Sequence, residues 1–156
     1  MDMPSVQDLF AKAKGQPIAY KGHTVQMVDC LRVSDGQMLK VKFESVNSDW
    51  RQGVNLTTDG SFEVNDQGIK NSIVLWHDTA PSEVYVKIHS RQGECLVKNV
   101  WDVGDGVVHS WHNGAAMIVE EFQNGRQYKC NDGRADEDFD DLVFSIELVK
   151  EATRKL

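Results

Sequence analysis

Alternation between apolar and charged residues is the feature that most limits the fold of this chain. In residues 39–44, leucine, valine and phenylalanine occupy every second position, and lysine or glutamate occupies the positions between them. Residues 84–89 and 142–148 repeat the same two-residue period. Successive side chains of a β-strand point to opposite faces, so this period predicts strands with one buried face and one face in water.

Further strand candidates lie at residues 24–33, 95–101 and 116–122, and glycines separate most of them. About nine or ten short strands, with turns every 8–12 residues or so, are typical of a β-sandwich or a barrel. The sequence therefore predicts an all-β fold, an antiparallel and jelly-roll-like β-sandwich. Residues 34–37, Ser-Asp-Gly-Gln, have the composition of a turn and predict a β-hairpin between residues 24–33 and 39–44.

The N-terminal region differs from the rest of the chain. The sequence predicts that residues 1–22 form an arm, which contains a short amphipathic helix with Ser5 as its N-cap. Residues 23–150 predict a single β-sandwich domain, which is long enough to bury a substantial core. The chain has no internal repeat that would divide this domain further.

Composition restricts the partners of the protein. The formal net charge of −7 argues against non-specific nucleic-acid binding and against attraction to anionic membranes. No apolar run approaches the roughly 18 residues of a membrane span, so no membrane insertion is expected. The first residues also lack the pattern of a secretory signal, and we therefore expect a cytoplasmic protein or one exported without a signal peptide. Association of identical copies into a homo-oligomer is left open.

The chain has three cysteines, Cys30, Cys95 and Cys130, each next to or within a predicted strand. An odd number without a secretory signal argues against a disulfide framework, so we expect small buried thiols. One disulfide with a spare thiol is the alternative.

The most unusual segment is the acidic run CNDGRADEDFDDLVF at residues 130–144. Aspartates occupy positions 136, 138 and 140, directly before the last predicted strand. Side chains two residues apart can converge on one side of an extended backbone, and calcium takes about six to eight oxygen ligands. Carboxylates this close together repel one another, and a bound cation would remove that cost. The sequence therefore predicts a calcium site with the ligands Asn131, Asp132, Asp136, Asp138, Asp140 and Asp141.

Two other interpretations concern the same acidic run. An EF-hand that starts at Asp136 would need glycine at its sixth position, where this chain has Asp141 followed by a strand. The EF-hand is therefore excluded. A solvated acidic loop that keeps the edge of the last strand from aggregating is the remaining alternative to a calcium loop.

The sequence DEDFDDLVFSIEL, which begins at Asp136, resembles the acidic C-terminal signature of a bacterial domain family of unknown function. That family occurs in large surface and matrix proteins, and its signature, D-x-D-[F/Y/W]-[N/D]-D-[L/V]-V-[F/V], is taken to be a calcium site. The family usually has asparagine at the place of Asp140. The resemblance implies bound Ca²⁺ and is carried by Asp136, Asp138, Phe139, Asp140, Asp141, Leu142, Val143 and Phe144.

Small calcium-dependent bacterial lectins are similar to this chain in architecture. They also place paired aspartates and asparagines on a loop before a terminal strand. This likeness implies a carbohydrate or a surface glycoconjugate as the partner.

Aromatic residues in polar surroundings suggest where such a ligand would bind. Trp50 and Trp111 lie in the sequences NSDWRQG and HSWHNG, and exposed aromatic rings of this kind can stack on sugars. Asn113 and Asp78 are the polar candidates beside them. In contrast, Trp76 and Trp101 end apolar runs and are expected in the core.

Residues for catalysis are scarce. No nucleophile elbow, phosphate loop, dinucleotide fingerprint or metalloprotease motif occurs in the sequence. His77, His109 and His112 could form a zinc or acid–base site only if the fold brings them together. We therefore expect a non-enzymatic calcium-binding module that recognises carbohydrate or another cell-surface ligand. The first alternative is a structural or protein-interaction domain with a solvated acidic loop, and the second is a hydrolase with a histidine-containing site.

Overall fold

The computed structural model describes residues 18–20, 23–26, 28–48, 50–64, 67–69, 71–102, 104, 116–131 and 141–149. These residues form strands and connecting turns, and they contain no helix, which confirms the all-β prediction. The helix expected near Ser5 lies outside the described residues. The strands are β1 (Ile18–Tyr20), β2 (His23–Gln26), β3 (Asp29–Arg32), β4 (Gln37–Val46), β5 (Arg51–Thr57), β6 (Ser61–Val64), β7 (Gln67–Ile69), β8 (Ser72–Trp76), β9 (Glu83–His89), β10 (Glu94–Asp102), β11 (Ala116–Phe122), β12 (Gly125–Asn131) and β13 (Leu142–Val149).

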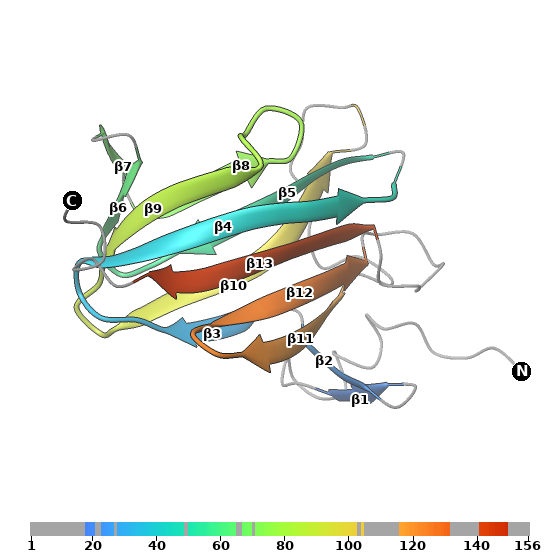
Figure 1. Ribbon diagram of the computed structural model, residues 1–156, viewed down its shortest axis with the longest axis horizontal. Coiled ribbons are helices and arrows are strands. Elements are labelled where there is room, and N and C mark those ends of the chain that lie inside the picture. Colours follow the sequence, from blue (N-terminus) through green and yellow to red (C-terminus); the bar gives the residue numbers. More distant parts are fainter. Residues whose placement is uncertain are drawn as a thin grey trace, which may run out of the picture.

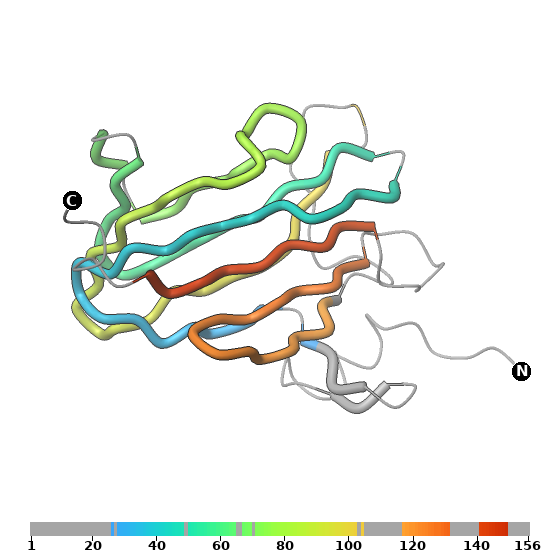
Figure 2. The backbone as a smooth tube through the Cα atoms, viewed as in Figure 1, coloured from blue at the N-terminus to red at the C-terminus, as the bar shows by residue number. Residues whose placement is uncertain are grey.

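The strands form two antiparallel sheets that lie one over the other (Figure 1). The large sheet has nine strands in the order β1-β2-β11-β12-β13-β4-β9-β6-β7, and the small sheet has the order β3-β10-β5-β8. Most strands run along the long axis of the molecule, so their connections gather at its two ends (Figure 2). No helix in the described part of the chain is long and apolar enough to cross a membrane.

The alternating residues account for the core between the sheets. Leu39 and Val41 of β4 are fully buried, while the lysines beside them face outward. The small sheet contributes Val54, Leu56 and Val97 to the same cluster, so the two sheets share one core in a sandwich-like arrangement. Burial of these apolar faces is the main term that holds the sheets together.

A polar contact also crosses the interior. Arg126 of β12 donates to both carboxylate oxygens of Asp29 in β3, at 2.9 and 2.7 Å, and the Tyr128 hydroxyl donates to Asp29 at 2.8 Å. Asp29 is 3% exposed, and the Tyr128 ring stacks on Phe144. Burial and, to a smaller extent, the charge of Asp29 raise the pKa of Tyr128, so its hydroxyl remains a donor. The contact links the large and the small sheet.

The predicted hairpin before residue 39 is wrong. Residues 24–33 divide into β2 and β3, and β3 pairs with β10 in the small sheet, whereas β4 pairs with β13 and β9 in the large sheet. The turn itself is present, with Gly36 at φ 80° and the Gln37 N–H donating to the Ser34 carbonyl at 3.0 Å. Two hydrogen bonds accompany the crossing between the sheets. The Val33 N–H donates to the carbonyl of Gly93, next to β10 of the small sheet, and the Gly36 N–H donates to the carbonyl of Ile88 in β9 of the large sheet.

All three cysteines are free thiols. Cys95 and Cys130 are buried as expected, and burial raises the pKa of the Cys95 thiol to about 12. Cys30 is exposed instead, because it occupies the outward position between the buried residues Asp29 and Leu31 of β3.

Candidate functional site

One end of the sandwich, called the loop end here, collects the described residues that the sequence marked as functional. Strand register explains this, because Gln52 pairs with Trp101, Gly53 with Trp76 and Val46 with Leu142. The loop end lies at the right of Figure 1, where β4, β8, β10 and β12 end and β5, β9, β11 and β13 begin. It includes Trp50, Asp78, Asn131 and Asp141.

The other predicted site residues belong to segments 105–115 and 132–140. They lie outside the described residues, so their side chains are not placed: Trp111, Asn113, Asp132, Asp136, Asp138 and Asp140. The strands that flank these segments all meet at the loop end, where Ala116 of β11 pairs with Asn131 of β12. The described strands on either side of both segments therefore end or begin at the same end of the sandwich.

Asn131 and Asp141 flank the acidic segment, and both are buried, at 0% and 1% exposure. The Asp141 N–H donates to the Cys130 carbonyl at 3.1 Å, and the Asn47 N–H donates to the Asp141 carbonyl at 3.0 Å. The Asn99 side chain donates to the Asn131 carbonyl at 2.7 Å. Burial, then the Asp141 carboxylate, raises the pKa of Cys130. The two ends of the acidic segment are thus fixed side by side against a buried carboxylate.

Trp50 is half-buried and stacks on the buried Trp101 ring, with centroids 6.4 Å apart and planes 13° apart. The buried Gln52 side chain donates to the Trp50 carbonyl at 3.2 Å. Trp101 is 2% exposed, which confirms its expected place in the interior. One face of the Trp50 ring is therefore in contact with the protein itself.

Asp78 is held by an ion pair at the loop end. Arg51 Nε donates to its two oxygens at 2.8 and 3.0 Å, and the Arg51 guanidinium lies 4.3 Å over the centre of the Trp76 ring. A Cβ at Gly53 would lie 2.8 Å from the Trp76 ring, so only glycine lets the ring lie flat across β5. Trp76 consequently covers the outer face of the small sheet, and its expected core position is wrong.

The described histidine of the suggested zinc or acid–base site is His77. Its ring meets Phe43 edge to face, with centroids 5.7 Å apart and planes at 82°. His109 and His112 lie outside the described residues. Among the residues that the structure describes, no three His, Cys, Asp or Glu side chains lie close enough together to hold a metal ion.

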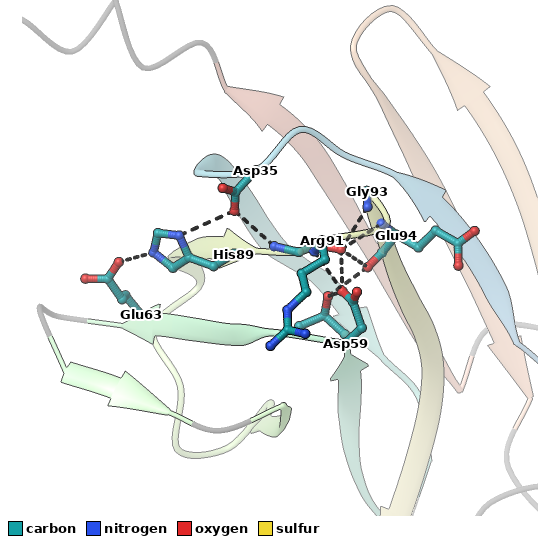
Figure 3. A network of polar contacts seen from close by, with 9 residues as sticks. Asp35, Asp59, Glu63, His89, Arg91, Gly93 and Glu94 are labelled. Atoms are coloured by element: carbon teal, nitrogen blue, oxygen red, sulfur yellow. Dashed lines mark hydrogen bonds and ion pairs between the residues drawn. The ribbon is translucent and has the colours of Figure 1, made fainter.

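The opposite end of the sandwich carries a polar network that sequence reasoning missed (Figure 3). Asp59 accepts hydrogen bonds from Ser90 Oγ at 2.7 Å and from the N–H groups of Arg91 and Gln92 at 3.1 Å each. The Ser90 hydrogen bond, followed by these backbone donors, holds the pKa of Asp59 below its ordinary value. This carboxylate therefore braces the turn from β9 to β10, and its only sequence signal is the turn composition around it.

His89 lies between two carboxylates at the same end, as Figure 3 shows. Its Nδ1 is 3.6 Å from Asp35, and its Nε2 makes a close contact with Glu63. The hydrogen bond from His89 lowers the pKa of Glu63. These contacts join the turn before β4 to β6 and β9, so we assign the network a structural role.

A second feature that the sequence did not predict is a hollow of about 330 Å³ on the outward face of the large sheet, called the outer hollow here. Residues of β4, β11, β12 and β13 line it, among them Lys42, Phe122, Gln127, Ser145 and Glu147. Its residues come from four strands, and β4 is distant in sequence from the other three, so no local motif marks it. No protein-family model, curated protein sequence or solved structure matches the chain.

Proposed function

We propose that the protein is a non-enzymatic, calcium-binding β-sandwich module that recognises carbohydrate or another cell-surface ligand. The observation that carries the proposal is the placement of Asn131 and Asp141, which are buried and fixed by backbone pairing on either side of the acidic segment. A segment with fixed ends loses less conformational entropy when it closes around an ion. The packed antiparallel sheets also support classing the domain as jelly-roll-like.

The chemistry of the acidic segment favours a hard cation. Carboxylate and amide oxygens are the ligands that calcium prefers, and one ion can take about six to eight of them. Neighbouring carboxylates disfavour one another's ionisation unless a positive charge lies between them. We assign the ion to Asn131, Asp132, Asp136, Asp138, Asp140 and Asp141.

The proposed ligand is a carbohydrate or surface glycoconjugate, with Trp50, Trp111, Asn113 and Asp78 as candidates for contact at the loop end. Trp50 supports this role because Trp101 holds its ring in one orientation. Asp78 is likewise held by Arg51.

Thermal unfolding tests the calcium proposal. An ion that binds only the folded chain stabilises it by about 2.7 kcal/mol when free calcium is about 100 times Kd. We expect Tm of the EDTA-treated protein to rise by about 5–10 °C on addition of calcium. The double variant Asp138→Asn with Asp140→Asn should lose this rise.

The matched control is the double variant Glu120→Gln with Glu121→Gln, which changes the net charge equally but lies on β11. It should keep the calcium response of the wild type. A wild-type Tm that is the same in EDTA and in calcium would contradict the proposal. That result would favour the structural or protein-interaction domain with a solvated acidic loop.

A further inference from the structure

The positions of short and long side chains on the large sheet explain the outer hollow. Strand register places Gln127, Ser145 and Lys42 in one row across β12, β13 and β4. The next row contains Gly125 and Glu147. Ser145 has a short side chain among the long side chains that line the hollow, so the surface is lower at this position.

The polar groups around the hollow are held in place by their neighbours. Gln127 Nε2 donates to the two oxygens of Glu44 at 3.1 and 3.3 Å. The Lys40 ammonium is 3.5 Å from Glu83. Lys42 is exposed beside Ser145. A ligand would therefore meet Gln127, Glu44 and Lys40 in positions that are restrained before it binds, which reduces the entropic cost of binding.

Two exposed aromatic residues lie on the same row of the sheet. Phe122 pairs with Gly125 on β12, and the row continues through Glu147 and Lys40 to Tyr85 on β9. Phe122 is 44% exposed and Tyr85 45% exposed. The row crosses four spacings of about 4.8 Å, so the aromatic residues lie about 19 Å apart. This distance suits an extended chain of several sugar rings.

Glycine at position 125 helps to fix the Phe122 ring. A Cβ at this position would lie 2.7 Å from Phe122 Cζ, so the ring occupies the space that a side chain would fill. The ring consequently rests on the sheet at the edge of the hollow and keeps nearly half of its surface in water. An aromatic surface of this kind can stack on the apolar face of a sugar.

The charges around the hollow narrow the class of ligand. Its lining contains two lysines and four glutamates, Lys40, Lys42, Glu44, Glu120, Glu121 and Glu147. This excess of carboxylates disfavours chains that carry uronic acids or sulfates. Its place in the middle of the sheet also disfavours a peptide added as a strand, which requires a free sheet edge.

We propose that the outer hollow, together with Phe122 and Tyr85, binds a neutral oligosaccharide that lies across the strands of the large sheet. The inference rests on the carbohydrate half of the proposed function and moves the main glycan contact from the loop end to the sheet face. It does not require the ion, because the lining residues lie on paired strands.

Glycan binding by the full chain tests this inference. The probes are neutral oligosaccharides of glucose, mannose and N-acetylglucosamine, with oligogalacturonate and heparin fragments as anionic counterparts. We expect a neutral probe to bind in calcium and in EDTA, and the anionic probes to bind more weakly. Phe122→Ala and Ser145→Tyr should each lower the affinity for the neutral probe about tenfold or more. The first variant removes an aromatic ring that would contact the sugar, and the second fills the hollow with a larger side chain.

Leu96→Ala is the matched control, because Leu96 is 40% exposed but lies on β10 of the small sheet. It should bind as the wild type does, and the Tm of all variants shows whether they fold. The inference is overturned if no neutral probe binds, or if Phe122→Ala and Ser145→Tyr bind like the wild type. Glycan binding that vanishes in EDTA but survives both variants would overturn it in favour of the loop end, while leaving the calcium proposal intact.

Discussion

At the scale of single residues, a buried polar contact helps to hold the two sheets together. Asp29 accepts hydrogen bonds from Arg126 and Tyr128, and its side chain is only 5% exposed. Burial would lower the pKa of Arg126, but the hydrogen bond and charge of Asp29 outweigh it and raise that pKa. Arg126 therefore stays charged inside the protein, where Asp29, at 2.7 Å, is its nearest ion-pair partner.

Asp29→Ala should lower the free energy of unfolding by about 3–5 kcal/mol, because it leaves a largely buried guanidinium without its counter-charge. Glu121→Ala is the control, since Glu121 also contacts Arg126, at 3.1 Å, but its side chain is 73% exposed. Glu121→Ala should lower the free energy of unfolding by less than about 1 kcal/mol. Urea unfolding of both variants measures the difference, and equal losses would contradict the assigned role of Asp29.

Asp59 should make stability depend on acid pH. Its folded-state pKa lies below the ordinary 3.8, mainly through the Ser90 hydrogen bond, so its stabilising effect is complete above that value. The effect is lost as pH falls through the lowered pKa. Asp59→Ala should therefore have a lower Tm near neutral pH and a shallower fall of Tm toward strong acid. Ser90→Ala should flatten the acid limb in the same way, and an acid limb as steep as that of the wild type would refute the linkage.

At the scale of strands and turns, close backbone contacts set which residues the connections accept. A Cβ at Gly60, between β5 and β6, would lie 1.9 Å from the His89 carbonyl oxygen. Gly60→Ala should therefore displace the turn and destabilise the protein by about 1–3 kcal/mol. Gly68→Ala, in β7, meets no atom within 4 Å and serves as the control. Denaturation midpoints that fall equally in both variants would contradict this account.

The alternating pattern predicted several strands correctly because it reports local burial. The alternating residues 84–89 lie within β9 as expected, and β13 begins at Leu142. Pairing was less predictable, since the hydrogen bonds that place β3 and β4 in different sheets come from β9 and β10, far along the chain. The apolar neighbours of Trp76 predict a core position, because they do not show that contacts with Arg51 and Gly53 hold the ring on the outer face.

At the scale of the whole molecule, the sequence could predict a site only where its residues are close in the chain. Asn131 and Asp141 flank one acidic segment, so spacing and residue type predict that they share a site, and this stays a prediction. The outer hollow could not be predicted, because Phe122, Ser145 and Lys42 are brought together only by strand order. Binding surfaces on a sheet face combine every second residue of several strands, and this pattern also describes any solvated face.

Calorimetric titration of calcium into the EDTA-treated full chain tests whether the acidic segment, residues 132–140, binds calcium. We expect saturable binding with a Kd in the range of roughly micromolar to millimolar, as for other calcium modules. The Asp138→Asn with Asp140→Asn variant should lose this binding, and Glu120→Gln with Glu121→Gln should keep it. Absence of saturable heat at millimolar calcium, or equal binding by the Asp138 and Asp140 variant, would contradict the claim.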